Sequence, residues 1–599
     1  MSHDTVVSRL LQNAQKVPDK NALFRRSGGS WVSTTWKGYA DLTQRAARGF
    51  MALELQPGQV VSILSNNRQE WVLADMAAMT AGGIATGIYQ TNTAEQVAYV
   101  LRHAESPIVV LENEGQLKKV AQQRSTLPAL RWAIMLDGNV PAEHRQWALT
   151  WDELLQKAEA TPQAALDARI AALQPDQLAT LIYTSGTTGD PKGVMLSHKN
   201  LTWTADVLLN SLPKANEHRG MSYLPLSHIA EQMLSIHCAI SLYIEVWFAE
   251  SLEKLKENLP DCRPTVFFGV PRVFEKFEAA LAGRFKEATG VKANLLSFAR
   301  KTALEVDEVR EKGQTPGLFL NMQYGLANKL VLSKLKAALG LDQCLQVVSG
   351  AAPIGRSTLD FFRSIDLPIH EVYGQSEGSG PTTLNVVGGK RTGTVGKRLP
   401  GIEVKIAEDG EILVSGGNIF MGYYKNPEAT AETLKDGWMC SGDVGEFDSD
   451  GFLRITDRKK ELLKTSGGKY IAPTKIEKLL RAIPEVSQAV TIGDNRNFCT
   501  ALLTLEEAAA NRWAKENGIA ISDPKEIGKV LGKDASFLSY LQKQVDAINA
   551  TLAQYESLKK FVILGTDFSQ EGGELTPTMK LRRKIITQKY QPQIEGMYS

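Results

Sequence analysis

The sequence predicts an α/β fold with a large N-terminal domain of layered, largely parallel sheets, a small β-rich subdomain and a small α+β C-terminal domain. Short β-rich runs alternate with helical patterns in the first part of the chain, short strands and turns dominate from residue 401, and a mixed pattern resumes after residue 460. Alternating strands and helices are typical of parallel sheets covered by helices. A chain of 599 residues is also long enough for more than one domain.

The individual strands follow from short apolar runs that end in small or polar residues. Residues 60–64 and 107–111 are predicted strands, and the segments 70–80 and 94–104 between them are predicted helices. We expect further strands at residues 179–183, 345–348, 369–373, 403–406 and 410–415. Loops at the ends of such strands are where α/β folds bind ligands, so the residues after them are the first candidates for a site.

Long helices are predicted between residues 273 and 341. The GQTPG segment at 313–317 divides them, because glycine and proline end helices. Amphipathic stripes usually face a core, and we therefore interpret this region as a helical layer packed on the sheet, not as a membrane-surface element. Two apolar windows, 73–89 and 229–249, are interrupted by charged or polar residues and predict buried helices, not membrane spans.

Composition narrows the class of protein. The chain has 68 basic and 66 acidic residues, a net charge of +2, so no overall field draws it onto nucleic acid and we expect no such partner. Its five cysteines are scattered without a CxxC pair, which suggests neither disulfides nor structural zinc and favours the cytoplasm. No secretory signal is recognisable. Peripheral contact with the inner face of a membrane and the oligomeric state, with a homodimer as one candidate, stay open.

Residues 184–193, Thr-Ser-Gly-Thr-Thr-Gly-Asp-Pro-Lys-Gly, give the strongest local signal for a ligand. The segment holds four hydroxyl side chains, three glycines and one lysine. Glycines let backbone N–H groups approach phosphate oxygens, hydroxyls donate further hydrogen bonds, and Lys192 can offset phosphate charge. It is not a Walker A loop, because Gly193 stands where Ser or Thr would follow the lysine. The segment predicts a polyphosphate site of another kind.

This loop resembles the phosphate loop of the adenylate-forming superfamily, which comprises acyl-CoA synthetases, luciferase and peptide-synthetase adenylation domains. The resemblance continues, in the same order, at residues 224–232, 349–353, 373–380, 441–443, 457–461, 466–471 and 576–583. It covers the chain from roughly residue 20 to its end. It implies an adenylation and acyl-binding domain at 1–457, a hinge at 458–460 and a mobile C-terminal lid domain at 461–599, with ATP, Mg²⁺ and coenzyme A as cofactors.

The resemblance also implies a nucleotide site. Tyr373 would border adenine, Ser376 would contact the α-phosphate, Asp443 would accept both ribose hydroxyls, and Arg458 would add a ribose or phosphate contact. Taken alone, each of these motifs also fits an ordinary turn. The implied nucleotide- and CoA-binding residues are Thr184, Ser185, Gly186, Thr187, Thr188, Gly189, Lys192, Gly350, Ala351, Ala352, Tyr373, Gly374, Ser376, Asp443, Arg458, Gly467 and Gly468.

Four residues are implied in catalysis: Lys580, Glu377, His228 and Lys192. Glu377 would bind Mg²⁺ together with Thr184. Lys580 would neutralise charge that develops on the α-phosphorus during adenylate formation. His228 would gate or orient the acyl carboxylate, although a lone histidine on an apolar segment is more often a core residue.

The motif around Lys580 departs from the commoner family pattern, because Thr578 and Met579 replace the Ser-Gly before the lysine; long-chain members share this form. Lys460 matches the position about which the C-terminal domain rotates. The glycines at 467 and 468 would let the pantetheine of CoA pass. No carrier domain follows the lysine motif, which favours free CoA as the acceptor.

Residues 270–276 and 470–473 resemble long-chain fatty acyl-CoA synthetases of the bubblegum-like branch. The implied reaction forms acyl-CoA from a fatty acid, ATP and CoA through an acyl adenylate, with release of pyrophosphate and AMP. Three alternatives stay open. They are a fatty acyl-AMP ligase that passes the acyl group to a carrier protein, a medium-chain or aryl acid–CoA ligase, and a non-catalytic lipid-binding scaffold.

Overall fold

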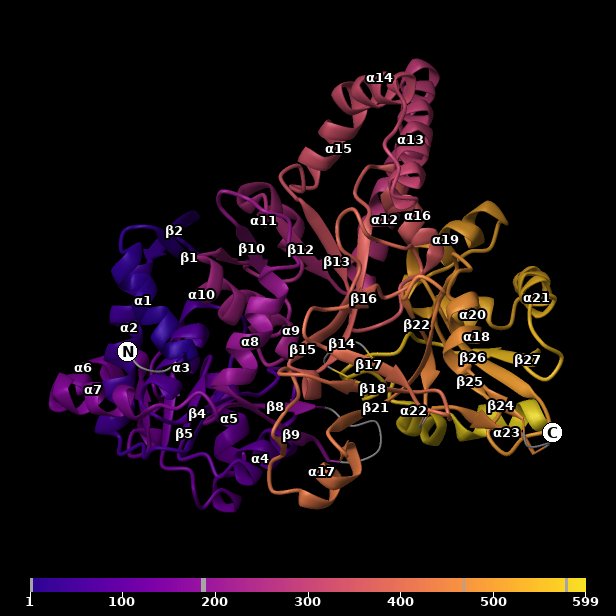
Figure 1. Cartoon of the computed structure of the whole chain (residues 1–599). Helices are drawn as coiled ribbons and strands as arrows, with labels where there is room; N and C mark the ends of the chain where they lie inside the picture. Colours follow the sequence, from indigo (N-terminus) through magenta and orange to yellow (C-terminus); the bar gives the residue numbers. More distant parts are fainter. Residues whose placement is uncertain (1–3, 185–189, 460, 467–468, 577–579) are drawn as a thin grey trace.

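An eight-stranded sheet forms the first layer of the N-terminal part. The computed structural model describes residues 4–184, 190–459, 461–466, 469–576 and 580–599 (Figure 1). The strand order is β19 (Gly422–Tyr423), β9 (Lys192–Ser197), β8 (Leu178–Thr184), β4 (Ile84–Gly87), β3 (Val60–Leu64), β5 (Ile108–Leu111), β6 (Trp132–Met135) and β7 (Ala148–Thr150). From β8 to β7 all neighbours are parallel, while β9 is antiparallel to both β8 and β19.

The centre of this sheet is buried on both faces. All five residues of β3 are buried, as expected for a parallel strand covered by helices on each side. The helices of this region are α1 (Val6–Lys16), α2 (Trp36–Ala52), α3 (Gln69–Thr80), α4 (Ala94–His103), α5 (Glu114–Gln122), α6 (Trp151–Lys157), α7 (Gln163–Ala172) and α8 (His198–Leu209). Capping boxes fix several helix starts, for example Thr5 with Ser8 on α1 and Thr150 with Glu153 on α6.

A second, five-stranded sheet lies beside the first. Its order is β12 (Val266–Gly269), β13 (Gln346–Ser349), β14 (Ile369–Gln375), β15 (Gly380–Leu384) and β16 (Lys397–Arg398). The first three strands are parallel, and β15 turns back antiparallel to β14. A smaller four-stranded sheet joins β10 (Arg219–Ser222), β11 (Glu245–Phe248), β1 (Asn21–Ser27) and β2 (Ser30–Thr35).

The two apolar windows, predicted as buried helices, each contain a helix followed by a strand, so the prediction is only partly right. The window at 73–89 is the end of α3 followed by the buried strand β4. The window at 229–249 is a broken helix followed by β11. The broken helix consists of α9 (Ile229–Gln232), a π-helical turn at Met233–Cys238 and α10 (Ala239–Leu242). Among the described residues, no helix has the length and apolar character to cross a membrane.

The region predicted as a helical layer on the sheet is only partly that. The segments are α11 (Leu255–Cys262), α12 (Pro271–Lys286), α13 (Gly290–Glu311), α14 (Leu318–Ala327), a π-helical turn at Asn328–Leu332, α15 (Ser333–Ala338) and α16 (Arg356–Ser364). The break at 313–317 is confirmed. Helices α12 and α13 pack on α16, but α13 to α15 form a hairpin that stands out from the body at the top of Figure 1. The interpretation as a packed layer is wrong for α14, where only Ala327 is buried.

The β-rich subdomain and the C-terminal part follow as predicted. The subdomain sheet contains β17 (Glu403–Ile406), β18 (Glu411–Ser415), β21 (Trp438–Phe447), β20 (Leu434–Lys435) and β22 (Leu453–Arg458), with α17 (Pro427–Thr433) beside it. The C-terminal strands are β23 (Leu463–Lys464), β24 (Tyr470–Ile471), β25 (Val486–Ile492), β26 (Cys499–Leu505) and β27 (Leu558–Ile563). Its helices are α18 (Pro473–Leu480), α19 (Glu507–Glu516), α20 (Ile527–Leu531), α21 (Ala535–Asn549), α22 (Arg583–Lys589) and α23 (Gln591–Tyr598).

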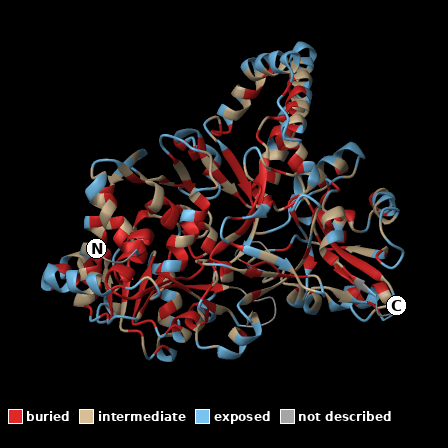
Figure 2. Ribbon diagram, in the orientation of Figure 1, coloured by how far each residue is buried: buried red, intermediate tan, exposed pale blue. Residues whose placement is uncertain are grey.

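Separate hydrophobic cores correspond to these parts. In Figure 2 the buried residues follow the sheets, and the C-terminal part has buried strands of its own. Residues from Ile471 to Ile563 form one of its core clusters, and residues from Val490 to Met597 form another. The fold is therefore mixed α/β with layered sheets and a distinct α+β C-terminal part, which confirms the predicted fold class.

Candidate active site

The predicted phosphate loop connects two antiparallel strands. Strand β8 ends at Thr184, and β9 begins at Lys192, directly opposite it in register. Ser185, Gly186, Thr187, Thr188 and Gly189 lie outside the described residues. The Lys192 Nζ lies 4.8 Å from the centroid of the Tyr423 ring, a cation–π contact that directs the ammonium toward β19.

Glu377 follows β14 in a short 3-10 turn. Its Oε1 accepts a 2.8 Å hydrogen bond from the Tyr423 hydroxyl, and its backbone oxygen accepts one from Phe420 N. Burial raises the pKa of Tyr423, and the charge of Glu377 raises it further, so the phenol stays protonated and donates. Tyr423 therefore contacts both Lys192 and Glu377, two residues that the sequence predicts to handle phosphate and metal.

Glu377 suits Mg²⁺ in its chemistry. A magnesium ion takes oxygen ligands and is commonly held by one or two carboxylates plus substrate phosphates. Because the hydrogen bond from Tyr423 uses Oε1, the carboxylate keeps Oε2 as a ligand atom. Thr184, the other predicted ligand, ends β8; its Oγ1 lies 3.5 Å from the backbone oxygen of Lys192.

Asp443, on β21, is the centre of a second polar group. Its Oδ2 accepts a 2.8 Å hydrogen bond from the Tyr373 hydroxyl, and its Oδ1 accepts one of 3.0 Å from Arg458 Nε at the end of β22. A carboxylate offers about four acceptor positions, so both oxygens can still accept ribose hydroxyls. Asp443 itself is buried. The structure thus brings together three predicted residues that lie on three different strands.

The small residues after β13 and on β14 leave no room for side chains. A Cβ atom on Gly350 would lie 2.6 Å from Val372 Cγ1, and one on Gly374 would lie 1.8 Å from the backbone oxygen of Gly380. Ala351 has a φ of +68°, which is uncommon for a residue other than glycine. Ala352 follows at an exposed position, and Ser376 is buried.

An unpartnered hydroxyl lies at the end of the same strand. Ser349 Oγ is buried and has no hydrogen-bond partner among the described residues. Buried polar atoms are nearly always paired, so such an atom beside a strained turn fits a place where a polar ligand edge completes the bonding. The turn and Ser349 are compatible with a planar base that binds against the backbone.

His228 caps α9. Its Nδ1 accepts a hydrogen bond of 3.2 Å from Ala230 N, which places any ring proton on Nε2. Burial, together with the charge of Lys580, lowers the pKa of His228 to about 4, so the imidazole is neutral at pH 7. A neutral histidine that carries its proton on Nε2 can donate it to a carboxylate.

Lys580, from the C-terminal part, comes close to the groups of the N-terminal part. The pKa of Lys580 is lowered to about 8, mainly by burial and also by the charge of Arg458, while the charges of Asp443 and Glu377 partly offset this shift. Its backbone is clamped to Thr576, whose N–H donates to Lys580 O and whose Oγ1 accepts from Lys580 N. The charges of Arg458, Asp443 and Glu377 thus act on Lys580, and that of Lys580 acts on His228, so the structure brings these five residues near one another.

Some predicted residues are not placed. Lys460, Gly467 and Gly468 lie outside the described residues. The structure also shows two features that the sequence did not predict: Tyr423 beside Glu377, and the ion pair between Arg583 and Glu477. Arg583 donates to both carboxylate oxygens of Glu477 at 2.7 and 2.5 Å, three residues after Lys580. Both features are contacts between segments that are distant in the sequence, so no local motif predicts them.

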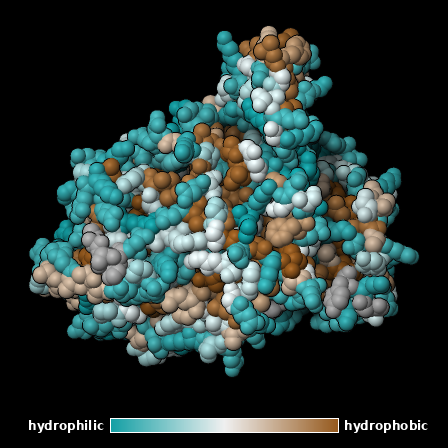
Figure 3. All heavy atoms as spheres, viewed as in Figure 1, coloured by the Kyte–Doolittle hydropathy of each residue, from teal (hydrophilic) through white to brown (hydrophobic). Residues whose placement is uncertain are grey.

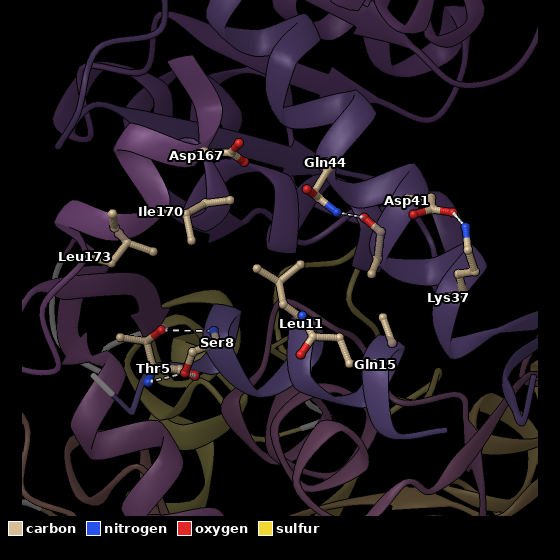
Figure 4. A pocket seen from close by; sticks show the side chains of 13 residues that line it. Thr5, Ser8, Leu11, Gln15, Lys37, Asp41, Gln44, Asp167, Ile170 and Leu173 are labelled. Atoms are coloured by element: carbon tan, nitrogen blue, oxygen red, sulfur yellow. Dashed lines mark hydrogen bonds and ion pairs between the residues drawn. The ribbon is translucent and has the colours of Figure 1, made fainter. Parts of the chain in front are cut away.

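A separate hollow of about 520 Å³ lies between α1, α2 and α7 (Figure 4). Leu11, Gln44 and Ile170 are among its lining residues, and none of the predicted site residues lines it. It is therefore distinct from the group of residues around Lys580.

Comparison with known protein families matches the chain from near its start to its end. The sequence profile described as "AMP-binding enzyme" matches residues 10–424, and the profile described as "AMP-binding enzyme C-terminal domain" matches residues 460–599. One curated relative is the long-chain-fatty-acid–CoA ligase ACSBG2 of Xenopus laevis, 39% identical over 99% of this chain and 84% of the relative. Another is the long-chain-fatty-acid–CoA ligase FadD15 of Mycobacterium tuberculosis, 37% identical over 100% of this chain and 97% of the relative.

Solved structures share the fold at lower sequence identity. The anthranilate CoA ligase AuaEII in complex with anthranoyl-AMP aligns with a TM-score of 0.73 at 17% identity, covering 99% of this chain and 98% of that one. The A domain of the carboxylic acid reductase from Segniliparus rugosus, in complex with AMP and a carboxylic acid, aligns with a TM-score of 0.74 at 19% identity, covering 99% and 94%. At these identities the likeness establishes the fold alone.

Proposed function

Since the chain belongs to the AMP-binding enzyme family, we propose that it is a long-chain fatty-acid–CoA ligase, an enzyme that forms acyl-CoA from a fatty acid, ATP and CoA. The observation that carries the proposal is that Lys580, of the C-terminal part, lies near enough to Glu377, Asp443 and His228 of the N-terminal part for their charges to interact. The full-length likeness to two long-chain-fatty-acid–CoA ligases supports the choice of acid and acceptor.

In this proposal ATP binds between Asp443 on β21, the turn after β13 and the loop after β8. Asp443 accepts from the ribose while Tyr373 and Arg458 hold its carboxylate in place. The turn at 349–353 meets the base, and the loop at 184–193 holds the β- and γ-phosphates, with Lys192 as its cation. Mg²⁺, held by Glu377, supplies charge neutralisation on the phosphate oxygens.

The first half-reaction joins the acid to AMP. A carboxylate oxygen attacks the α-phosphorus, the bond to the β,γ-pyrophosphate breaks, and pyrophosphate leaves with that electron pair. Lys580 lies where its ammonium can offset the added negative charge on the α-phosphate. Neutral His228 donates from Nε2 to the acyl carboxylate and orients it without adding a cation.

The second half-reaction transfers the acyl group to CoA. The thiolate of CoA attacks the acyl carbonyl, and the bond to AMP breaks. We propose that the C-terminal domain at 461–599 rotates about the hinge at 458–460, with Lys460 as the pivot, which withdraws Lys580 and brings Gly467 and Gly468 to the pantetheine channel. These domain limits, with the N-terminal domain at 1–457, rest on the family resemblance. The same holds for the pivot and the pantetheine channel.

The setting of the enzyme is part of the proposal. All five cysteines are free thiols, and three of them are buried, which fits a reducing compartment such as the cytoplasm. A homodimer and a peripheral position on the inner face of a membrane are the candidates for its assembly and attachment.

A single assay tests the function against its alternatives. Purified protein is incubated with ATP, Mg²⁺ and acids of two to twenty-two carbons, with and without CoA, and acyl-CoA, AMP and pyrophosphate are measured. Acyl-CoA formation that is highest for long chains supports the proposal. Acyl-AMP that accumulates without turnover of free CoA would instead identify an acyl-AMP ligase. A preference for medium-chain or aryl acids would identify a medium-chain or aryl acid–CoA ligase. If no acid gives an adenylate, the non-catalytic lipid-binding scaffold is the remaining alternative.

A further inference from the structure

Helix α14 and its continuation expose an unusual set of large apolar side chains. Leu318 is 82% exposed, Phe319 73%, Met322 67%, Leu326 52% and Leu330 38%. At 100° per residue these five positions fall within about one third of the helix circumference, so they form one stripe. We call these five residues the α14 stripe. In Figure 3 apolar surface gathers at the top of the projecting hairpin.

The opposite face of the same helix is properly packed. Ala327 and Leu332 form a small core with Ala299 and Ala303 of α13. The side chains of Tyr324 and Lys336 both bond to Asp366 in the body, at 2.8 and 2.6 Å. The helix is therefore anchored by one face, and the α14 stripe is the other face of a folded element.

The charge of the segment is one-sided. Residues 312–341 contain four lysines and no aspartate or glutamate, in a chain whose net charge is only +2. Lys312, Lys329 and Lys334 are exposed, while Lys336 is paired with Asp366. An exposed apolar stripe flanked by lysines is complementary to an anionic lipid surface, where each nearby lysine contributes about 1 kcal/mol.

We propose that the α14 stripe docks the protein on an anionic membrane surface, with the apolar side chains in the interfacial region and the three exposed lysines among the headgroups. A second copy of the chain fits less well. A stable protein interface uses about 20–30 residues on each side, whereas the α14 stripe offers five on one projecting helix, and lysines facing lysines would repel.

Docking would bring the protein to a store of its acid. This consequence rests on the proposed function, because a long-chain acid partitions into bilayers. The docking itself does not depend on catalysis, and it can be measured without ATP, CoA or acid.

Vesicle binding by the full chain tests the proposal. Sedimentation with vesicles of phosphatidylcholine alone is compared with sedimentation with an equimolar mixture of phosphatidylcholine and phosphatidylglycerol, at low and high salt. We expect binding to the mixed vesicles that weakens as salt rises. The double variant Phe319→Ser/Met322→Ser should bind at least about tenfold more weakly, since two large apolar side chains no longer enter the interface. Lys329→Glu/Lys334→Glu should lose the preference for anionic vesicles.

Leu252→Ser is the matched control, because Leu252 is 50% exposed but lies outside the hairpin. It should bind like the parent, and the melting temperatures of all variants should agree, since only exposed side chains change. Absence of binding by the parent, or equal binding by the stripe variants and the control, overturns the proposal. So does a parent dimer in size-exclusion chromatography that Phe319→Ser/Met322→Ser dissociates, because the stripe would then be a protein interface. Loss of ligase activity in the function assay would leave these outcomes unchanged.

Discussion

The two halves of the candidate active site are held in different ways. In the N-terminal half the side chains bond to one another: Tyr423 to Glu377, and Tyr373 and Arg458 to Asp443. In the C-terminal half Lys580 is placed through its backbone, by a two-way hydrogen-bonded clamp with Thr576. Mutual hydrogen bonds fix the first half before substrate arrives, whereas the cation arrives as part of another element. This difference predicts that the halves can be disabled separately.

The largest effect is expected from removal of the delivered cation. Lys580→Ala should lower the rate of adenylate formation by about 10²–10³-fold, the usual cost of losing one group that stabilises transition-state charge. Thioester formation from pre-made acyl-AMP and CoA should change little, because Lys580 is not needed at the reacting groups in that step. The two half-reactions are measured separately by pyrophosphate release and by acyl-CoA formation. An equal loss in both would show that Lys580 has no step-specific role.

The ion pair that follows Lys580 should matter next. Arg583 makes two parallel hydrogen bonds to the buried carboxylate of Glu477, and Glu461 lies 3.4 Å away. Arg583→Lys keeps the charge but cannot make the parallel pair, so we expect the C-terminal part to lose about 2 kcal/mol of unfolding free energy. Denaturant unfolding, followed by far-UV circular dichroism, measures it. Lys584→Arg on the same helix is the control, and a shift as large in the control would remove the special role of the pair.

The pH dependence of the reaction should report the same lysine. Since burial and Arg458 lower the pKa of Lys580 to about 8, its ammonium is present below pH 8 and is lost above it. We expect kcat/KM for ATP in adenylate formation to fall about tenfold per pH unit above that value. The limb of kcat should lie at higher pH, because bound triphosphate stabilises the ammonium. Lys580→Arg should remove the limb, since arginine stays charged; a limb that persists would belong to another group.

The same comparison separates what the sequence could and could not predict. Strands and the turns after them depend on local pattern, so β8, β13, β14 and β18 could be predicted from the sequence. Whether an apolar helix is buried or exposed could not be predicted. Helix α3 is buried on all sides and α14 carries an exposed stripe, although both are rich in apolar residues, because burial depends on which distant segment packs against a helix.

Within the site, the sequence again could not predict contacts between distant segments. Glu377 belongs to a motif in the turn after β14, and Asp443 belongs to a motif within β21. The partner of Glu377, Tyr423, lies on the edge strand β19, which reaches the site only because β19 pairs with β9. A Gly-Tyr-Tyr triplet carries no local mark of that pairing. A mutation at Tyr423 therefore tests a feature that only the fold reveals.

The smallest expected effect is at this tyrosine. Tyr423→Phe keeps the ring under Lys192 but removes the hydroxyl that donates to Glu377 Oε1. Loss of one hydrogen bond to a charged acceptor, partly offset because the carboxylate can turn toward the metal or water, should cost about 1 kcal/mol, or about fivefold in the Mg²⁺ concentration for half-maximal adenylation. Tyr424→Phe, the neighbouring residue, is the control and should leave that concentration unchanged. Because Tyr423 only positions Glu377, kcat at saturating Mg²⁺ should stay close to that of the parent; a large fall in kcat would instead mean that the hydroxyl acts on the reacting groups.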